Sequence, residues 1–377
     1  MKMLLSPVCW LAMAILNIVS GQPVVQSGLF PVSGNQAVAS VPGIMLLSEG
    51  QVVDISSPGL PTLIGNFSMK NCAATILIHG HLAFYGSDRE ATLHVADLTD
   101  PANPVPAGSV QIKGASIIFS MDIAGNALYL TAGNQKVYTI DISNPAIPEI
   151  RDSVETGWVF DLAVRDSFAY VSGYDHGLQI YDLREPWTMK QVASAGFDYY
   201  SVELADTLAF LGSDSEGGID VVSIADPFNP RLVSTIPGIR EGPVWDLKFR
   251  DGYLYSATRD KGLLIYDTST GKIAAQFQGA NYGECYSVCL QDSLILLSTA
   301  RKGVAILKFT PEIVSAKYLT EACPDGWLYP NPAADHIYLR KSGSFILSGM
   351  DGVIVRQQVN VQEGERVNLA EIGRAHV

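Results

Sequence analysis

The sequence contains few charged residues and few cysteines. Only 17% of its 377 residues are charged and five are cysteine, whereas 47% are hydrophobic. A chain of this length with so much apolar material can bury a large core, so it neither needs a disulfide framework nor has the composition of a disordered protein. The 34 glycines and 20 prolines interrupt the whole chain, which excludes a long coiled coil.

Basic residues are scarce relative to acidic ones. The 25 lysines and arginines face 38 aspartates and glutamates, which gives a net charge of -13. Because an acidic surface repels a phosphate backbone, the composition predicts no nucleic-acid partner.

Only the first residues contain a long apolar run. Residues 1–21 combine Lys2 with the apolar stretch Leu4–Val19 and end in Ser20 and Gly21, a pattern typical of a signal peptide cleaved before Gln22. A membrane anchor is the alternative, but the run is short and no basic flank follows it. No other segment approaches the ~20 apolar residues that cross a bilayer, so we expect export across the inner membrane and no transmembrane segment in the mature chain.

One phrase, an apolar run followed by Asp and a turn, recurs seven times. Its anchor positions 54, 97, 141, 182, 223, 267 and 308 are separated by 41 to 44 residues. A fixed period of this length indicates a repeat architecture. The copies are Val52–Pro58, Val95–Pro101, Thr139–Pro145, Ile180–Pro186, Val222–Pro227, Ile265–Ser269 and the degenerate Leu307–Pro311.

Each copy contains four short strand patterns. In the fourth copy these are Val159–Val164, Phe168–Ser172, Leu178–Leu183 and Met189–Ala195, separated by polar turns. Pro-x-x-Pro pairs after the third strand place the fourth at an outer edge, because proline cannot donate to a ladder. The pattern predicts an all-β fold: a seven-bladed β-propeller of about 42-residue, four-stranded repeats over residues 22–319.

The phrase resembles the LVIVD repeat, found in surface and secreted propeller proteins of bacteria and archaea. Val137–Pro145 and Gly177–Asp182 are the nearest to it, and the resemblance covers about Gln36 to Leu319. Copies one, five and seven depart from the pattern. The family implies an architecture and no single activity.

After a linker at 320–327, residues 328–370 open with a different motif and alternate like a small β-sandwich. The opening is similar to the type A C-terminal sorting domain of the type IX secretion system, which implies the secretion machinery as partner and an extracellular or outer-membrane-surface location in a Gram-negative bacterium. The domain would be truncated, since 371–377 reads like translated sequencing adapter. The motif residues are Tyr329, Pro330, Asn331, Pro332 and Asp335.

One column of the aligned copies is polar. In six copies it lies 21 or 22 residues before the anchor, on the first strand; Ala37 fills the position in the first copy. Oxygen ligands of this kind would suit a channel cation such as calcium. The other interpretation, which we favour, is that each group bonds a backbone N–H of its own or the next blade. The column contains Thr75, Ser120, Asp161, Ser201, Asp246 and Ser287.

Other chemistry is sparse. HExxH, P-loop, GxSxG and dinucleotide motifs do not occur, and no cofactor is expected. Cys72, Cys285, Cys289 and Cys323 are expected to be buried free thiols. Trp158 and Trp245 are interpreted as matching positions just before the first strand; we favour packing between blades over a carbohydrate platform.

These observations favour a secreted or cell-surface binding scaffold for a protein or glycan ligand, since rigid blades carry variable loops. The second hypothesis is a hydrolase or lyase with a metal or acid pair at the channel mouth near Asp161 and Asp246. A third is a structural protein of the cell envelope. A catalytic propeller should bring His, Arg, Tyr and carboxylate together on one face, whereas a binding module should expose an aromatic or apolar patch there.

Overall fold

The structure is a computed structural model. It describes residues 24–32, 37–69, 72–185, 187–196, 198–213, 218–238, 242–259, 261–278 and 282–310, with five further strands between 328 and 368. The expected signal peptide, the linker and the adapter-like end lie outside the described residues, as do Asn331, Pro332 and Asp335 of the expected sorting motif.

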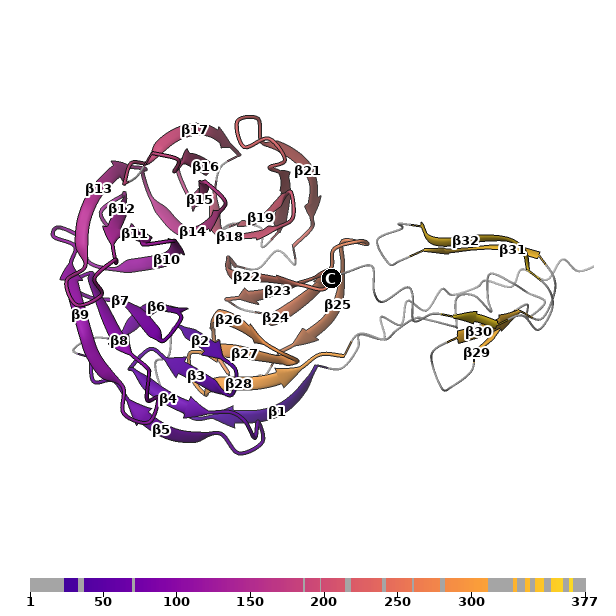
Figure 1. The fold of residues 1–377 in the computed structure, drawn as a ribbon, viewed down its shortest axis with the longest axis horizontal. Coiled ribbons are helices and arrows are strands. Elements are labelled where there is room, and N and C mark those ends of the chain that lie inside the picture. Colours follow the sequence, from indigo (N-terminus) through magenta and orange to yellow (C-terminus); the bar gives the residue numbers. More distant parts are fainter. Residues whose placement is uncertain are drawn as a thin grey trace, which may run out of the picture.

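Seven four-stranded antiparallel sheets surround a central axis (Figure 1), which confirms the seven-bladed propeller. Blade 1 contains β2 (Val38–Val41), β3 (Ile44–Leu47), β4 (Gln51–Asp54) and β5 (Thr62–Asn66). Blade 2 contains β6 (Ala73–His79), β7 (Leu82–Ser87), β8 (Thr92–Asp97) and β9 (Val105–Gln111). Blade 3 contains β10 (Ile118–Ala124), β11 (Ala127–Ala132), β12 (Lys136–Asp141) and β13 (Glu149–Glu155).

The remaining blades repeat this order. Blade 4 contains β14 (Val159–Arg165), β15 (Phe168–Gly173), β16 (Gly177–Asp182) and β17 (Lys190–Ala195). Blade 5 contains β18 (Tyr199–Ala205), β19 (Leu208–Ser213), β20 (Ile219–Ser223) and β21 (Arg231–Ile236). Blade 6 contains β22 (Val244–Arg250), β23 (Tyr253–Thr258), β24 (Gly262–Asp267) and β25 (Lys272–Phe277).

Blade 7 is assembled from both ends of the propeller sequence. Its inner three strands are β26 (Cys285–Gln291), β27 (Leu294–Thr299) and β28 (Gly303–Lys308), and its outer strand is β1 (Val25–Phe30). β1 pairs antiparallel with β28, from Val25 opposite Lys308 to Phe30 opposite Val304. The repeat period did not predict this pairing, because β1 precedes the first copy. The ring is closed by hydrogen bonds rather than by a covalent continuation of the last copy.

The recurring Asp forms the turn that follows the third strand. Asp54 accepts the backbone N–H of Ser56 at 2.8 Å, and Asp97 accepts that of Thr99 at 2.7 Å. This local bond stabilises the turn into the outer strand. In blade 5 Ser223 replaces the anchor; Asp226, three residues later, accepts the N–H of Phe228, as Asp100 accepts that of Ala102 in blade 2. The same turn occurs at Asp141, Asp182 and Asp267.

The outer strands carry glycine where the next blade approaches closely. A Cβ added to Gly28 of β1 would lie 1.8 Å from the carbonyl oxygen of Pro58 in the turn of blade 1. The proline turns therefore end a blade at its rim, as predicted, and also pack on the outer strand of the preceding blade. The same contact joins Gly65 to Pro101 and Gly108 to Pro145.

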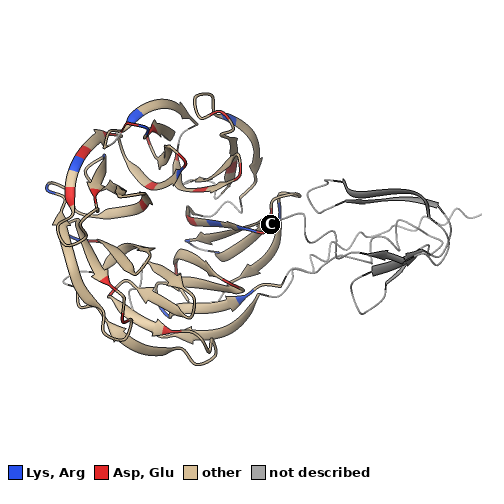
Figure 2. Ribbon diagram, viewed as in Figure 1, with Lys and Arg blue, Asp and Glu red and all other residues tan. Residues whose placement is uncertain are grey.

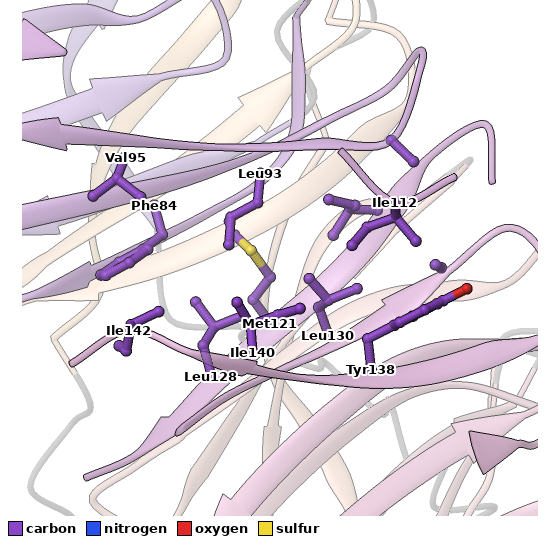
Figure 3. Close-up of a cluster of buried hydrophobic side chains, with 13 residues drawn as sticks. Phe84, Leu93, Val95, Ile112, Met121, Leu128, Leu130, Tyr138, Ile140 and Ile142 are labelled. Atoms are coloured by element: carbon purple, nitrogen blue, oxygen red, sulfur yellow. The ribbon is translucent and has the colours of Figure 1, made fainter. Parts of the chain in front are cut away.

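Charged residues are sparse on the strands (Figure 2), and the core is divided among the blade interfaces. Seven buried hydrophobic clusters among the described residues each combine side chains of two neighbouring blades. Figure 3 shows one, in which Phe84 and Leu93 of blade 2 face Met121, Leu128 and Ile140 of blade 3. Each blade is therefore stabilised by burying both of its faces against neighbours, as in other repeat architectures.

The C-terminal strands form two further antiparallel sheets. One contains β29 (Leu328–Pro330), β30 (His336–Leu339) and β33 (Arg366–Asn368), with Tyr329 and Pro330 on β29. The other contains β31 (Gly343–Ser348) and β32 (Ile354–Val361). No helix of the length and hydropathy that a bilayer span requires occurs in the part of the chain that the structure describes.

Candidate functional site

A cavity of about 780 Å³ lies at the centre of the ring, and residues from all seven blades line it. The first strands of neighbouring blades lie against one another around this cavity, so the first strand of each blade is innermost, as the column of polar residues required. The cavity is the central channel of the propeller.

Six of the seven inner strands have a β-bulge near the start. In each case the register shifts by one residue, and the extra residue immediately precedes the polar column. A bulge leaves one residue unpaired and redirects its side chain, and bulges are common beside binding sites. The bulged residue is Ala74 in blade 2 and aromatic in blades 3 to 7.

The five bulged aromatic residues form what we call the aromatic collar. They are Phe119, Phe160, Tyr200, Trp245 and Tyr286, and all five line the channel. Successive ring centroids are 5.4, 4.1, 5.9 and 5.5 Å apart, so each ring contacts the next around the channel. Such contacts stabilise aromatic pairs beyond their buried area. The collar is a continuous apolar arc at the end of the channel where the inner strands begin.

The collar corrects the sequence interpretation of the two tryptophans. Trp245 lies within β22 at the bulge and corresponds to Phe160 of β14, whereas Trp158 lies before β14 and is 43% exposed. The alignment placed Trp245 outside the strand because a bulge adds a residue that the sequence pattern does not reveal. An aromatic residue one position before the polar column in five copies was the signal that could have found the collar.

Five residues of the predicted polar column line the channel, namely Thr75, Ser120, Asp161, Asp246 and Ser287. Ser201 does not, because its buried hydroxyl donates to the carbonyl oxygen of Val244 in the next blade at 2.9 Å and is drawn into the interface.

The two aspartates of the column join adjacent blades. Asp161 accepts the backbone N–H of Val202 in blade 5 at 2.9 Å and the hydroxyl of Ser120 in blade 3 at 2.6 Å. Asp246 accepts the N–H of Val288 in blade 7 at 2.9 Å. The two carboxylates thus make the kind of contact that the structural interpretation expects, whereas the hydroxyls of Ser120 and Ser201 donate to oxygen atoms.

A second layer of carboxylates, which the sequence analysis missed, lies two residues further along the inner strands. Asp122 accepts the N–H of Val164 in blade 4 at 2.7 Å, and Glu203 accepts that of Phe249 in blade 6 at 3.0 Å. An inner strand is the edge of its sheet, so some of its N–H groups face the channel and need partners there. Each carboxylate supplies such a partner to the following blade.

Lys248 occupies the second-layer position in blade 6. It is the one cation among the described residues that line the channel. Its Nζ lies 3.3 Å from Asp246 Oδ1 and 3.8 Å from Glu203 Oε2, and its side chain keeps 40% of its accessible surface. Because the channel is wide enough to admit water, this ammonium group is enclosed by the protein and hydrated at the same time.

Burial raises the pKa of three of the carboxyls that line the channel. It raises the pKa of Asp161 to about 6, against the opposing effects of Lys248 and of the Ser120 hydrogen bond. Burial also raises the pKa values of Asp122 and Glu203. Burial alone would lower the pKa of Lys248, but the charges of Asp246, Glu203 and Asp161 outweigh it and raise the value. The lysine therefore stays charged, whereas Asp122, Asp161 and Glu203 keep their protons to a higher pH than exposed carboxyls do.

Other expected features have separate outcomes. Among the described residues, no three His, Cys, Asp or Glu side chains are grouped to hold a metal ion; calcium in the channel stays a prediction. Cys72, Cys285 and Cys289 are free, as expected, although only Cys285 is fully buried. Cys323 lies outside the described residues.

A second, smaller cavity of about 420 Å³ lies between blades 6 and 7 and shares two lining residues, Glu284 and Tyr286, with the channel. Glu284 accepts hydrogen bonds from Arg259 Nε at 2.9 Å and from the Tyr286 hydroxyl at 3.0 Å. This carboxylate fixes one residue of the collar and is itself paired with a cation.

Comparisons with known proteins agree with the fold. Residues 51–69, 120–156 and 241–270 match the model of the LVIVD repeat. No curated protein matches the chain. Among solved structures, the crystal structure of the computationally designed Ika8 protein is similar, with 15% sequence identity, a TM-score of 0.55, and coverage of 77% of this chain and 100% of its own. This likeness concerns the fold alone. The chain is thus a seven-bladed β-propeller that contains LVIVD repeats.

Proposed function

We propose that the protein is a binding module whose ligand enters the central channel through the aromatic collar. The observation that carries the proposal is the position of five aromatic residues on bulges at one end of a 780 Å³ cavity. Concave sites with aromatic walls and a few polar groups are the usual form of small-ligand sites. The inner strands hold these side chains rigidly, so little ordering is needed on binding.

The same end of the ring exposes further aromatic surface. Trp158 is 43% exposed and Tyr174 is 50% exposed, and the backbone N–H of Tyr174 donates to the carbonyl oxygen of Trp158 at 2.8 Å. Both residues border the start of β14, the strand that carries Phe160. An exposed aromatic surface around the channel mouth is what distinguishes a binding module from a catalytic propeller in our sequence analysis.

The enzymatic alternative receives less support. Asp161 and Asp246 both use a carboxylate oxygen to bind a backbone N–H of the next blade. No histidine or arginine is found among the described residues that line the channel. A hydrolase or lyase would need acid, base or electrophilic groups that converge on a reacting atom. Asp161 and Asp246 each use one of their two oxygens to join neighbouring blades.

The proposed module is exported and acts outside the cell or at the outer-membrane surface. Support comes from the sequence of residues 1–21 and from the sorting motif that begins at Tyr329. Expression of residues 1–370, continued by the missing end of a type A sorting domain, in a bacterium with a type IX system tests this. We expect a secreted or surface-exposed product with Gln22 as its first residue, detected by N-terminal sequencing; an uncleaved cytoplasmic product would contradict export.

Ligand-observed NMR tests the binding proposal. Oligosaccharides, short peptides and small amphiphiles are screened against the full chain and against Phe160→Ala, which removes one ring of the collar. We expect ligands whose saturation-transfer signal falls at least fivefold with the variant. Phe228→Ala is the matched control. It removes a 47% exposed aromatic side chain from a turn at the opposite end of the propeller. Hits that respond only to the control, or no hits, would contradict the proposal.

A further inference from the structure

The part of the channel next to the collar, which we call the chamber, contains four carboxyl groups and one ammonium group. Asp122, Asp161, Glu203, Asp246 and Lys248 all line it. A fifth carboxylate, Glu284, also borders the cavity but is paired with Arg259. If the four carboxyl groups are ionised, Lys248 neutralises one of them and a formal charge of -3 is left.

We propose that the chamber accepts an alkylammonium group, such as the end of a lysine side chain or of a polyamine, which enters through the aromatic collar. This inference rests on the proposed function, because it names the ligand class of the same site. The excess of negative charge on the chamber wall would draw such a cation inward.

The carboxylates retain acceptor capacity toward the channel. One oxygen of Glu203 is held by the N–H of Phe249, and one oxygen of Asp246 by the N–H of Val288. The second oxygen of each has Lys248 as its cationic contact, at 3.8 and 3.3 Å. These distances exceed those of an optimal charged hydrogen bond, so the oxygens can accept from a further ammonium group.

Lys248 shows that the chamber accommodates this chemistry. Its own side chain is an alkylammonium, with an apolar stem and a charged head among carboxylates. An incoming ligand of the same type would place its stem against the apolar collar and its head among the remaining carboxylates. Aromatic rings also attract cations that approach their faces.

The raised pKa values of the chamber carboxyls give the proposed binding a defined pH dependence. Burial holds the pKa of Asp161 at about 6, and those of Asp122 and Glu203 are also raised. An added cation would stabilise the carboxylate forms and release protons. Affinity should therefore rise between pH 5 and pH 7. The titratable or charged groups that face the chamber or its mouth are Asp122, Asp161, Glu203, Asp246, Lys248, Cys289, Tyr200, Tyr286 and Glu284.

Calorimetric titration of the full chain with three probes of equal length tests the proposal. The probes are 1,5-diaminopentane, 1,5-pentanediol and glutarate, which differ only in their end groups. At pH 7 we expect the diamine to bind at least tenfold more tightly than the diol, and glutarate not to bind. Titration in buffers of different ionisation enthalpy should show proton release with the diamine.

Two variants should move the diamine affinity in opposite directions. Glu203→Gln removes a chamber charge and should weaken binding at least fivefold, whereas Lys248→Met removes the resident cation and should strengthen it at least threefold. Glu185→Gln, at an exposed turn, is the control and should change nothing. Because the two expected changes have opposite signs, loss of folding in one variant cannot imitate the pattern.

The outcomes separate this inference from the proposed function. Equal affinities for diamine and diol, both weakened by Phe160→Ala, would overturn the assignment of an ammonium ligand and leave the collar as a binding site. Absence of diamine binding would also overturn it. Ligands that bind independently of both the collar and the chamber would overturn the proposed function as well.

Discussion

At the residue scale, polar side chains in the channel act mainly as connectors between blades. Asp122, Asp161, Glu203 and Asp246 each accept an N–H from the following blade, and all four contacts run in the same direction around the ring. These bonds stabilise backbone groups that would otherwise face the channel without a protein partner. They also concentrate negative charge near one ammonium group.

Replacement of Lys248 tests how far its ammonium group compensates the charges of the channel carboxylates. We expect Lys248→Met to lower the free energy of unfolding by about 1–2 kcal/mol at pH 8, since its loss leaves the carboxylates uncompensated while water in the channel screens part of the effect. The loss should shrink at pH 5, below the pKa of about 6 of Asp161, because that carboxyl then holds a proton. Urea unfolding at both pH values measures it, with the exposed Lys272→Met as control. Equal losses at both pH values would contradict this account.

The raised pKa of Asp161 predicts a pH dependence of defined sign. Between the unfolded value of about 4 and the folded value of about 6, the native protein holds a proton that the unfolded chain has released. This group therefore makes stability fall as pH rises through that window. In Asp161→Asn we expect a flatter dependence of the urea midpoint from pH 4 to pH 6.5, with a constant offset from altered hydrogen bonding.

The exposed Asp166→Asn is the control for this experiment, because asparagine tolerates its positive φ of 54°. Its profile should parallel that of the original protein. If Asp161→Asn and the original protein had parallel profiles too, the proton would not reside on Asp161.

At the scale of elements, the inner strand of a blade positions side chains in the channel, whereas the outer strand contacts the neighbouring blade. The bulge in an inner strand turns an aromatic side chain toward the channel, whereas the outer strand places a small residue against the proline turn of the next blade. Bulges and close approaches of this kind leave little trace in hydrophobic periodicity.

Gly28 in β1 provides a test of the close approach. A methyl group there would lie 1.8 Å from the Pro58 carbonyl oxygen, so Gly28→Ala must displace β1 or the turn. We expect a loss of about 2–3 kcal/mol in the free energy of unfolding, measured by denaturant titration.

Gly59→Ala is the matched control, because the nearest contact of its added Cβ would be Ser27 O at an ordinary 3.5 Å. It should be close to neutral. Two similar losses would indicate that the β1 contact with blade 1 is loose.

The repeat made most of these elements predictable. The four strands expected in blade 4 agree with β14 to β17, and the proline pairs correctly placed the fourth strand at the rim. The spacing also predicts a polar column on the innermost strands, and five of its six residues line the channel, all except Ser201. Strand positions follow from local pattern and period, which a sequence displays directly.

Features that depend on distant pairing were missed. Lys248 contacts Glu203 only because blades 5 and 6 are adjacent, and no local sequence pattern predicts that contact. The collar residues were visible in the sequence, but the bulge that re-aims them was not. β1 lies outside the repeat period, so its six residues do not indicate that it pairs with β28.

At the scale of the whole molecule, ring closure through β1 predicts how the chain can be rearranged. A permuted chain that begins at Ala37 and carries residues 24–32 after Thr310 keeps the β1–β28 pairing within one hairpin. We expect its melting temperature to stay within about 5 °C of the original, because the same contacts form.

Deletion of residues 24–32 without this transfer should behave differently. It exposes the edge of β28 and removes the outer wall of blade 7, so we expect a lower melting temperature and self-association through the free edge, measured by calorimetry and light scattering. If the deletion melted like the original protein, closure by β1 would not contribute to stability.

The closing strand also sets an order of events during synthesis. β1 leaves the ribosome first, yet the strand that it pairs with is made only after six complete blades. Until then β1 has no strand to pair with, and the nascent chain forms an incomplete ring of blades. Because this pairing joins segments that are far apart in the sequence, we expect it to form last, and until it forms both partner strands are open to pairing with another molecule.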